Sequence, residues 1–172
     1  MKSAMPYSVA IRAARVDDLP AICSINGQTL PAVSLLAPGD LNRVTASATV
    51  AWVALVDEVV SGYLFGYDAT ASYDGEEFAW FRSKGHDFLY VDQIAVARPL
   101  RRQGIGAALY DAVEALAGRE RLSSLVCDVN VLPPNPGSLA FHLRRGFVEA
   151  DRIQTRDGRR VALLRKELPV SV

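Results

Sequence analysis

The chain of 172 residues is long enough for one domain with a sizeable core. Half of its residues are hydrophobic, 22% are charged, and 19 basic side chains balance 19 acidic ones. This composition is typical of a globular protein, and the zero net charge argues against a general nucleic-acid-binding protein, which needs a basic surface.

The first part of the chain predicts strands interrupted by short helices. Asp17 or Asp18 can cap the first helix, and Asp57-Glu58 joins two strand-like runs in a hairpin. The expected strands are Ser8–Ala14, Val50–Val56 and Val59–Tyr67, and the expected helices are one ending near Thr29 and a short one at Asp40–Ala48.

A polar and aromatic insertion, Ala69–Asp87, follows this hairpin. Glu77, Trp80, Phe81 and Lys84 recur at helical spacing, so part of the insertion is expected to be helical. Carboxylates attract a cationic amine and aromatic rings stack on one, so the insertion is a candidate for ligand recognition. A packed cover or a contact in a homodimer is the alternative. The side chains that suggest recognition are Tyr73, Asp74, Glu76, Glu77 and Trp80.

The second part of the chain predicts a strand, a helix, a strand, a helix and a final hairpin. Gly118 is expected to close the first of these helices, Asn135 to cap the second, and Asp157-Gly158 to turn the hairpin. The expected ranges are Phe88–Val96, Gly104–Ala117, Ser123–Val129, Pro136–Arg145, Phe147–Ile153 and Val161–Glu167. The order of elements fits an α/β (α+β) fold with a mixed sheet and helices on both faces.

The segment Arg101-Arg102-Gln103-Gly104-Ile105-Gly106 joins the predicted strand Phe88–Val96 to the helix after it. The first amides of a helix have no partner within the helix, and the helix dipole adds positive charge at the same end. Glycines let a phosphate approach the backbone closely, and the arginines add fixed charge. These features predict an anion site.

Two familiar phosphate motifs do not fit this segment. A dinucleotide fingerprint requires a third glycine where this chain has Leu109, and a P-loop requires a Gly-Lys-Ser/Thr triplet that the chain lacks. A dinucleotide-binding enzyme that uses Gly104 and Gly106 remains an open alternative.

The pattern Arg-x-x-Gly-x-Gly after Val91–Val96 resembles the acetyl-CoA-binding motif of the GNAT superfamily of N-acetyltransferases. The segment from Asn135 to Phe147 resembles that family's second motif and keeps its Gly146-Phe147 pair. The resemblance implies one N-acetyltransferase domain over residues 1–172, with a mixed, mostly antiparallel sheet of about seven strands. It also implies acetyl-CoA as co-substrate. The implied cofactor-binding residues are Ile94, Ala95, Val96, Arg101, Arg102, Gln103, Gly104, Ile105, Gly106, Ala107, Asn130, Asn135, Ser138 and Phe141.

The resemblance also suggests three catalytic candidates. Asp92 and Asp128 match places where branches of the family carry an acidic residue, and a carboxylate can take the proton of an alkylammonium group. Either is a candidate for the base, and a structural partner for an arginine is the alternative for both. His142 stands where the family usually has a tyrosine near the sulfur of CoA; a histidine can donate a proton near neutral pH, or it can serve packing alone.

We therefore expect an acyltransferase that moves an acetyl group from acetyl-CoA to a primary amine of a small molecule or peptide. A non-catalytic CoA-binding module of the same fold is the alternative. Cys23 and Cys127 show no zinc spacing, so no metal is expected. No apolar run of about 18 residues and no signal peptide is apparent, so we expect a cytoplasmic protein without membrane or nucleic-acid partners, and a homodimer remains open.

Overall fold

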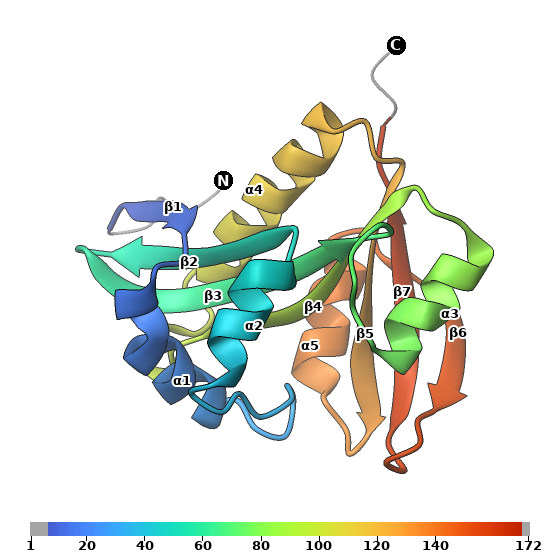
Figure 1. The fold of residues 1–172 in the computed structure, drawn as a ribbon, viewed down its shortest axis with the longest axis horizontal. Coiled ribbons are helices and arrows are strands. Elements are labelled where there is room, and N and C mark those ends of the chain that lie inside the picture. Colours follow the sequence, from blue (N-terminus) through green and yellow to red (C-terminus); the bar gives the residue numbers. More distant parts are fainter. Residues whose placement is uncertain (1–6, 170–172) are drawn as a thin grey trace. The chain divides into compact units, whose positions relative to one another are not determined.

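The computed structural model describes residues 7–169 and contains a seven-stranded sheet and five α-helices within that range (Figure 1). The strands hydrogen-bond in the order β1-β2-β3-β4-β5-β7-β6. Pairing is antiparallel for β1–β2, β2–β3, β5–β7 and β6–β7, whereas β4 and β5 run parallel. The expected mixed, mostly antiparallel sheet is confirmed. The strands are β1 (Val9–Ala13), β2 (Val50–Val56), β3 (Val59–Asp68), β4 (Phe88–Val96), β5 (Ser124–Leu132), β6 (Val148–Gln154) and β7 (Arg160–Glu167), and the helices are α1 (Leu19–Gly27), α2 (Asp40–Ser47), α3 (Glu76–Lys84), α4 (Ile105–Arg119) and α5 (Pro136–Arg144).

The internal contacts of the chain divide into two compact units. The first comprises residues 7–66 and 93–113, and the second comprises residues 67–92 and 114–169. The division passes through β3, β4 and α4, so each unit contains part of these elements.

In the first unit, helices cover both faces of the β1–β2–β3 meander (Figure 1). One face buries a core between α1, α2 and the sheet, which contains Ile22, Ile25, Leu36, Leu41, Val53, Tyr63, Phe65 and Ala95. The other face meets α4 at Gly62, where an added Cβ would lie 3.3 Å from the side chain of Ile105 and 3.0 Å from the carbonyl oxygen of Ala95. Glycine at this position therefore permits the close approach of the helix and strand to β3.

The start of the first helix differs from the expectation that Asp17 or Asp18 caps it. A 3-10 turn at Val16–Asp18 precedes α1, and Asp18 makes no side-chain cap bond to that helix. Its carboxylate instead accepts hydrogen bonds from both terminal nitrogens of Arg12, at 2.7 and 2.9 Å, and from the backbone N–H of Arg15. The capping prediction was wrong because Asp18 binds a charged guanidinium from β1, which also lowers the pKa of this carboxyl.

In the second unit, β5 pairs with β4 on one side and β7 on the other, and β6 lies at the edge. Helix α3 packs on β4 through aromatic rings: Phe78 and Phe81 both contact the rings of Phe88 and Tyr90. Helix α5 starts as predicted, with Pro136 in its first turn and Asn135 accepting the backbone N–H of Ser138 at 3.3 Å. The predicted helix within the insertion is likewise confirmed as α3.

The C-terminus of α4 corrects a second prediction. The helix continues through Gly118 to Arg119, and the left-handed residue after it is Arg121, with φ 57°. Gly118 therefore does not close the helix, and the backbone N–H of Leu122 reaches the carbonyl of Ala117 at 2.9 Å to complete the C-terminal turn.

Candidate active site

The loop that opens α4 has the backbone conformation expected of an anion site. Gly104 has φ 88° and Arg102 has φ 63°, both in the left-handed region. The first turn of α4 contains no acidic side chain. Its free backbone amides and the positive end of its dipole therefore meet no competing carboxylate from that turn, which suits a pyrophosphate.

Arg101 anchors this loop rather than extending from it. Its Nε donates to the carbonyl of Val96 at 3.0 Å, and its Nη2 donates to the carbonyl of Gln28 at 3.1 Å and to Thr29 Oγ1 at 3.0 Å. The guanidinium thus ties the loop to β4 and to the end of α1. Arg102 is exposed, and the side chain of Gln103 donates to the carbonyl of Pro99 at 3.0 Å.

The remaining candidates near this loop are Ile94, Ala95 and Val96 of β4 and Ile105, Gly106 and Ala107 of α4. Ala95 and Ile105 are buried, whereas Ile94, Val96, Gly106 and Ala107 are partly exposed. Within the first unit, the structure thus brings the loop-side candidates together on the end of one strand and the start of the next helix.

Two buried amide side chains hold the segment between α1 and α2, residues 28–39, in place. Asn26 donates to the carbonyl of Ser34 at 2.9 Å and accepts the backbone N–H of Leu36 at 2.9 Å. Gln93 donates to the same Ser34 carbonyl at 3.2 Å and accepts the hydroxyl of Tyr63 at 2.9 Å. This network positions the segment by backbone contacts.

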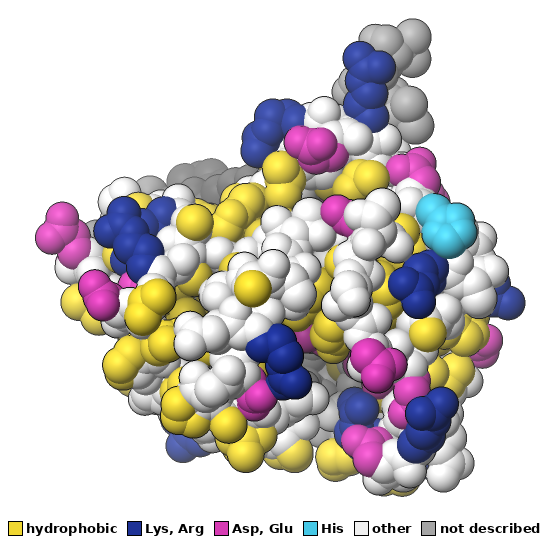
Figure 2. Space-filling view, in the orientation of Figure 1, with side chains coloured by type: hydrophobic (Ala, Val, Ile, Leu, Met, Phe, Trp, Pro, Cys, Tyr) yellow, Lys and Arg dark blue, Asp and Glu magenta, His cyan; other side chains and the backbone are white. Residues whose placement is uncertain are grey.

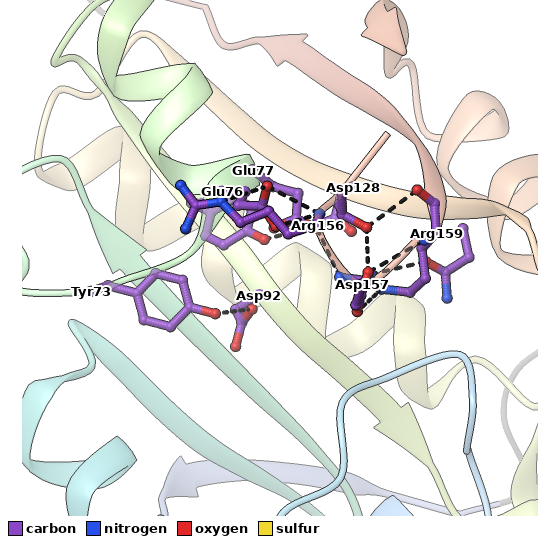
Figure 3. Close-up of polar contacts among 11 residues, drawn as sticks. Tyr73, Glu76, Glu77, Asp92, Asp128, Arg156, Asp157 and Arg159 are labelled. Atoms are coloured by element: carbon purple, nitrogen blue, oxygen red, sulfur yellow. Dashed lines mark hydrogen bonds and ion pairs between the residues drawn. The ribbon is translucent and has the colours of Figure 1, made fainter. Parts of the chain in front are cut away.

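The two candidate carboxylates lie on neighbouring strands in the second unit. The parallel ladder between β4 and β5 ends at the pair Val91 and Cys127, and Asp92 and Asp128 are the next residue on each strand. Each aspartate accepts a tyrosine hydroxyl. Tyr73 donates to Asp92 Oδ1 at 2.7 Å (Figure 3). Tyr90 donates to Asp128 Oδ1 at 2.6 Å.

A buried glutamate and an arginine complete this charged cluster. Glu77 of α3 accepts Arg159 Nη2 at 3.1 Å, and Arg159 also donates to Asn130 Oδ1 at 3.2 Å and to Asp157 Oδ2 at 2.8 Å (Figure 3). Asn130 is one of the residues expected to bind the cofactor, and in the structure its side chain contacts Arg159. The turn between β6 and β7 is held to α3 by this pair and by Glu76, which accepts the backbone N–H of Arg156.

The surroundings raise the pKa of both aspartates toward neutrality. Burial raises the pKa of Asp92 to about 6, while the Tyr73 hydrogen bond lowers it, Glu77 raises it and Arg159 lowers it. Burial raises the pKa of Asp128 to about 7, with Glu77 and Asp92 raising it and Tyr90 and Arg159 lowering it. A carboxylate with a pKa in this range suits a general base at neutral pH.

The surface over α3 and the β6–β7 turn carries both basic and acidic side chains (Figure 2). Figure 2 shows Lys and Arg side chains interleaved with Asp and Glu at the lower right, over the start of α3 and the β6–β7 turn. The exposed side chain of Arg156 beside Glu76, at 3.7 Å, belongs to this surface. Exposed pairs of this kind contribute little to stability, so the partly buried Glu77–Arg159 pair is expected to contribute more to the position of α3 than the Glu76–Arg156 pair.

His142 lies inside α5 with 3% of its surface exposed. Its Nδ1 lies 2.8 Å from the carbonyl oxygen of Ser138, so this nitrogen carries the proton and donates it. The rings of Phe141 and Phe147 meet the imidazole edge-on, each at 5.3 Å between centroids. Burial lowers the pKa of His142, which keeps the ring neutral at neutral pH. Ser138 and Phe141 are partly exposed on the same helix.

Sequence reasoning missed two members of the charged cluster. Tyr90 precedes Asp92 by two residues and so shares its side of β4, which was an available signal. Arg159 was not among the candidates, and its partners Glu77 and Asn130 lie 82 and 29 residues away in the chain. Tyr73, one of the side chains that suggested ligand recognition, donates its hydroxyl to Asp92.

Between residues 7 and 169, no group of three or more His, Cys, Asp or Glu side chains is arranged to hold a metal ion. Over the same residues, no helix combines the length and the apolar character that crossing a bilayer requires.

Comparison with known proteins identifies one family. The model of the Acetyltransferase (GNAT) family matches residues 19–147. Ard1 from Thermoplasma volcanium superposes with a TM-score of 0.76 at 18% identity, over 94% of this chain and 98% of that one. The ribosomal-protein-S18-alanine N-acetyltransferase from Escherichia coli has a TM-score of 0.73 at 15% identity, over 96% and 97%. The yncA protein from Salmonella typhimurium, solved with its cofactor acetyl-CoA, has a TM-score of 0.70 at 17% identity, over 96% of each chain. The search of curated proteins found no match.

Proposed function

The chain belongs to the acetyltransferase (GNAT) family, and from this premise we propose that it transfers the acetyl group of acetyl-CoA to a primary amine of a small molecule or peptide. The match covers residues 19–147 and similar structures cover 94–96% of the chain, which supports a single catalytic domain over the whole length. The proposal that the acceptor is an amine rests on the pair Asp92 and Asp128. Each of them accepts a tyrosine hydroxyl at the end of the β4–β5 ladder.

The loop at the start of α4 fits the pyrophosphate of acetyl-CoA. The left-handed conformation of Gly104 directs the chain into the first turn, whose amides can receive phosphate oxygens. Arg102 is exposed and can add charge, whereas Arg101 keeps the loop in place. We assign Gln103–Ala107 to the phosphates, Ile94–Val96 to the pantetheine arm, and Asn135, Ser138 and Phe141 to further contacts with the cofactor.

The two carboxylates can assist the deprotonation of the amine, which is the step with the larger free-energy cost. An alkylamine with a pKa of about 10.4 is mostly protonated at neutral pH, and freeing its lone pair costs about 4–5 kcal/mol. In the proposed reaction an N–H bond of the ammonium group breaks and an O–H bond forms on Asp92, which leaves a neutral amine as nucleophile. Acetyl-CoA, when bound, supplies the carbonyl carbon that the amine attacks and a thiolate leaving group. Asp128 is the second candidate for the proton.

The direct test is consumption of acetyl-CoA by the purified chain. We expect thiol release with members of a panel of primary amines and N-terminal peptides, and no release with their N-acetylated counterparts. Acetyl-CoA should also raise the melting temperature, because a ligand that binds only the folded state stabilises it. Binding without turnover over the whole panel would favour the non-catalytic CoA module, and a response to NAD(P)H instead of CoA would favour the dinucleotide alternative.

His142 is expected to contribute modestly. A thiolate with a reference pKa near 8.5 leaves readily, and a buried neutral imidazole is a weak acid, so His142→Ala should slow turnover by roughly 10²-fold or less. His142→Tyr, which restores the side chain usual in the family, should retain activity. The measurement is kcat for both variants, with melting temperatures recorded because the position is buried.

The two variants separate the roles open to His142. Unchanged kcat in His142→Ala would place the imidazole among packing residues. Loss of all turnover in both variants, with acetyl-CoA binding and melting temperature preserved, would show that the imidazole performs a step that tyrosine cannot.

A further inference from the structure

We propose that Tyr73, a residue of the insertion before α3, is a positioning residue for the base: its hydroxyl fixes Asp92 so that Oδ2 faces the ammonium group of the acceptor. The inference rests on the proposed function for the identity of the proton donor. The contact itself is independent of it: Tyr73 Oη donates to Asp92 Oδ1 at 2.7 Å, across 19 residues of sequence.

The ring of Tyr73 is held on two sides. It stacks on Tyr67 at the end of β3, with ring centroids 4.1 Å apart and planes 19° apart. The ring of Phe78 meets it edge-on at 5.5 Å. A side chain clamped between two rings has few alternative rotamers, so the hydroxyl is aimed at Asp92 before any ligand arrives.

Gly75 provides the space for this ring. A Cβ added at Gly75 would lie 2.6 Å from Cε1 of Tyr73, which is closer than packed carbon atoms approach. The backbone of Gly75, with φ −129° and ψ 139°, is one that alanine adopts freely. A methyl group at this position would therefore act on the tyrosine ring and not on the backbone.

The hydrogen bond also controls the charge on Asp92. Five groups bear on that carboxylate: Tyr73 before α3, Glu77 of α3, Tyr90 of β4, Asp128 of β5, and Arg159 beside β7. Burial and Glu77 raise the pKa of Asp92, and Tyr73 is the strongest of the groups that lower it. The pKa of Tyr73 is itself raised far above its ordinary value by burial and by Asp92, so the hydroxyl remains a donor throughout the working range.

Tyr73 therefore keeps Asp92 ionised at neutral pH and occupies one of its two oxygens. The remaining oxygen, Oδ2, is the one on which the O–H bond forms when the ammonium group loses its proton. Without the hydroxyl, the carboxylate would be protonated at a higher pH, and its orientation would no longer be fixed by the insertion.

The test compares Tyr73→Phe with the parent chain by two readouts. Carboxyl-detected NMR follows the titration of Asp92 directly and needs no substrate. We expect the pKa of Asp92 to rise by about one unit in Tyr73→Phe, the scale of one hydrogen bond to a charged group. The acid limb of the profile of kcat/KM against pH should move upward by the same amount, so that the rate falls about tenfold on the acid side and recovers at alkaline pH.

Two alanine variants at the ends of α3 provide a second test and its matched control. Gly75→Ala displaces the tyrosine ring and should shift the Asp92 titration in the same direction as Tyr73→Phe. Gly85→Ala, at the other end of the helix, has no atom within 4 Å of its new methyl group and should leave the titration unchanged.

The outcomes are separable from those of the proposed function. An unchanged Asp92 titration in Tyr73→Phe would overturn the inference, and so would a loss of rate by one constant factor at every pH. If the Asp92 titration shifts in Tyr73→Phe while the parent chain acetylates no amine, that result would support the Tyr73–Asp92 coupling and count against the proposed amine acetyltransferase activity.

Discussion

Asp92→Asn should lower kcat/KM for amine acetylation by about 10²-fold or more at neutral pH, within the range for loss of a general base. With a pKa of about 6, Asp92 is mostly ionised at pH 7 and can accept the proton of the ammonium group. Asparagine has nearly the same shape, and its carbonyl oxygen can still accept the Tyr73 hydroxyl, but it takes up no proton. The deficit should shrink toward alkaline pH, where free amine becomes abundant.

Asp128→Asn is the matched comparison, because Asp128 occupies the corresponding place on β5 and also accepts a tyrosine hydroxyl. Steady-state rates from about pH 6 to about pH 10 distinguish the two carboxylates. A larger, pH-dependent loss in Asp128→Asn would assign the base to β5. A constant ratio of Asp92→Asn to parent rates at every pH would make Asp92 a structural partner only.

Gly104→Val should abolish binding of acetyl-CoA. Gly104 has φ 88°, and a β-branched residue held in that region costs about 1–3 kcal/mol, so the loop is expected to abandon the conformation that presents the amides of α4. At a ligand concentration of about 100 times Kd, binding stabilises the parent chain by about 2.7 kcal/mol, and this increment should be lost in the variant. Thermal melts with and without acetyl-CoA, supported by calorimetry, measure it.

A glycine within α4 provides the control for this experiment. Gly118 lies within α4, and an added methyl group there meets no atom within 4 Å. Gly118→Ala should stabilise the chain by about 0.5–1 kcal/mol through the better helix propensity of alanine and should keep the response to acetyl-CoA. A full acetyl-CoA response in Gly104→Val would remove the loop from the cofactor site.

The elements were predictable because their signals are local. The hairpin at Asp57-Glu58 forms with both residues in the left-handed region, and Gly158 has φ 87° in the second hairpin. Asn135 and Pro136 open α5 as their chemistry requires. The strand Phe88–Val96 follows from an apolar run, and the helix after Gly104 follows from the helical spacing of its apolar residues.

The two errors concern the ends of helices, where another residue makes the interaction or takes the conformation that the rule assigns elsewhere. Asp18 is a good capping residue, but Arg12 on the preceding strand binds its carboxylate. Gly118 is a common terminator, but the helix continues past it and Arg121 takes the left-handed conformation instead. Both competitors lie within six residues in the sequence, but capping rules and terminator rules do not include an arginine on the preceding strand or a left-handed arginine after the helix.

The candidate site was predictable only in part. Asp92 and Asp128 were found from a family motif and their strands, but the hydroxyls that bind them and the Glu77–Arg159 pair were not. Contacts between residues 19 to 82 positions apart depend on how strands and helices pack, which no local pattern records. The pKa values of Asp92 and Asp128 are raised chiefly by burial and adjusted by those contacts, and both depend on the same packing.

We expect Arg159 to link the pH dependence of the proposed reaction to the attachment of the β6–β7 turn. Its guanidinium lowers the pKa of both Asp92 and Asp128, and the same group ties the β6–β7 turn to α3 through Glu77. A substitution of Arg159 that raised the pKa of the two aspartates would also loosen the β6–β7 turn. Adaptation to another pH therefore cannot change this side chain without a cost to the turn. The Tyr73 hydroxyl binds only Asp92 of the two carboxylates, so a change at Tyr73 would alter the titration and the orientation of that one group and leave the β6–β7 turn attached to α3.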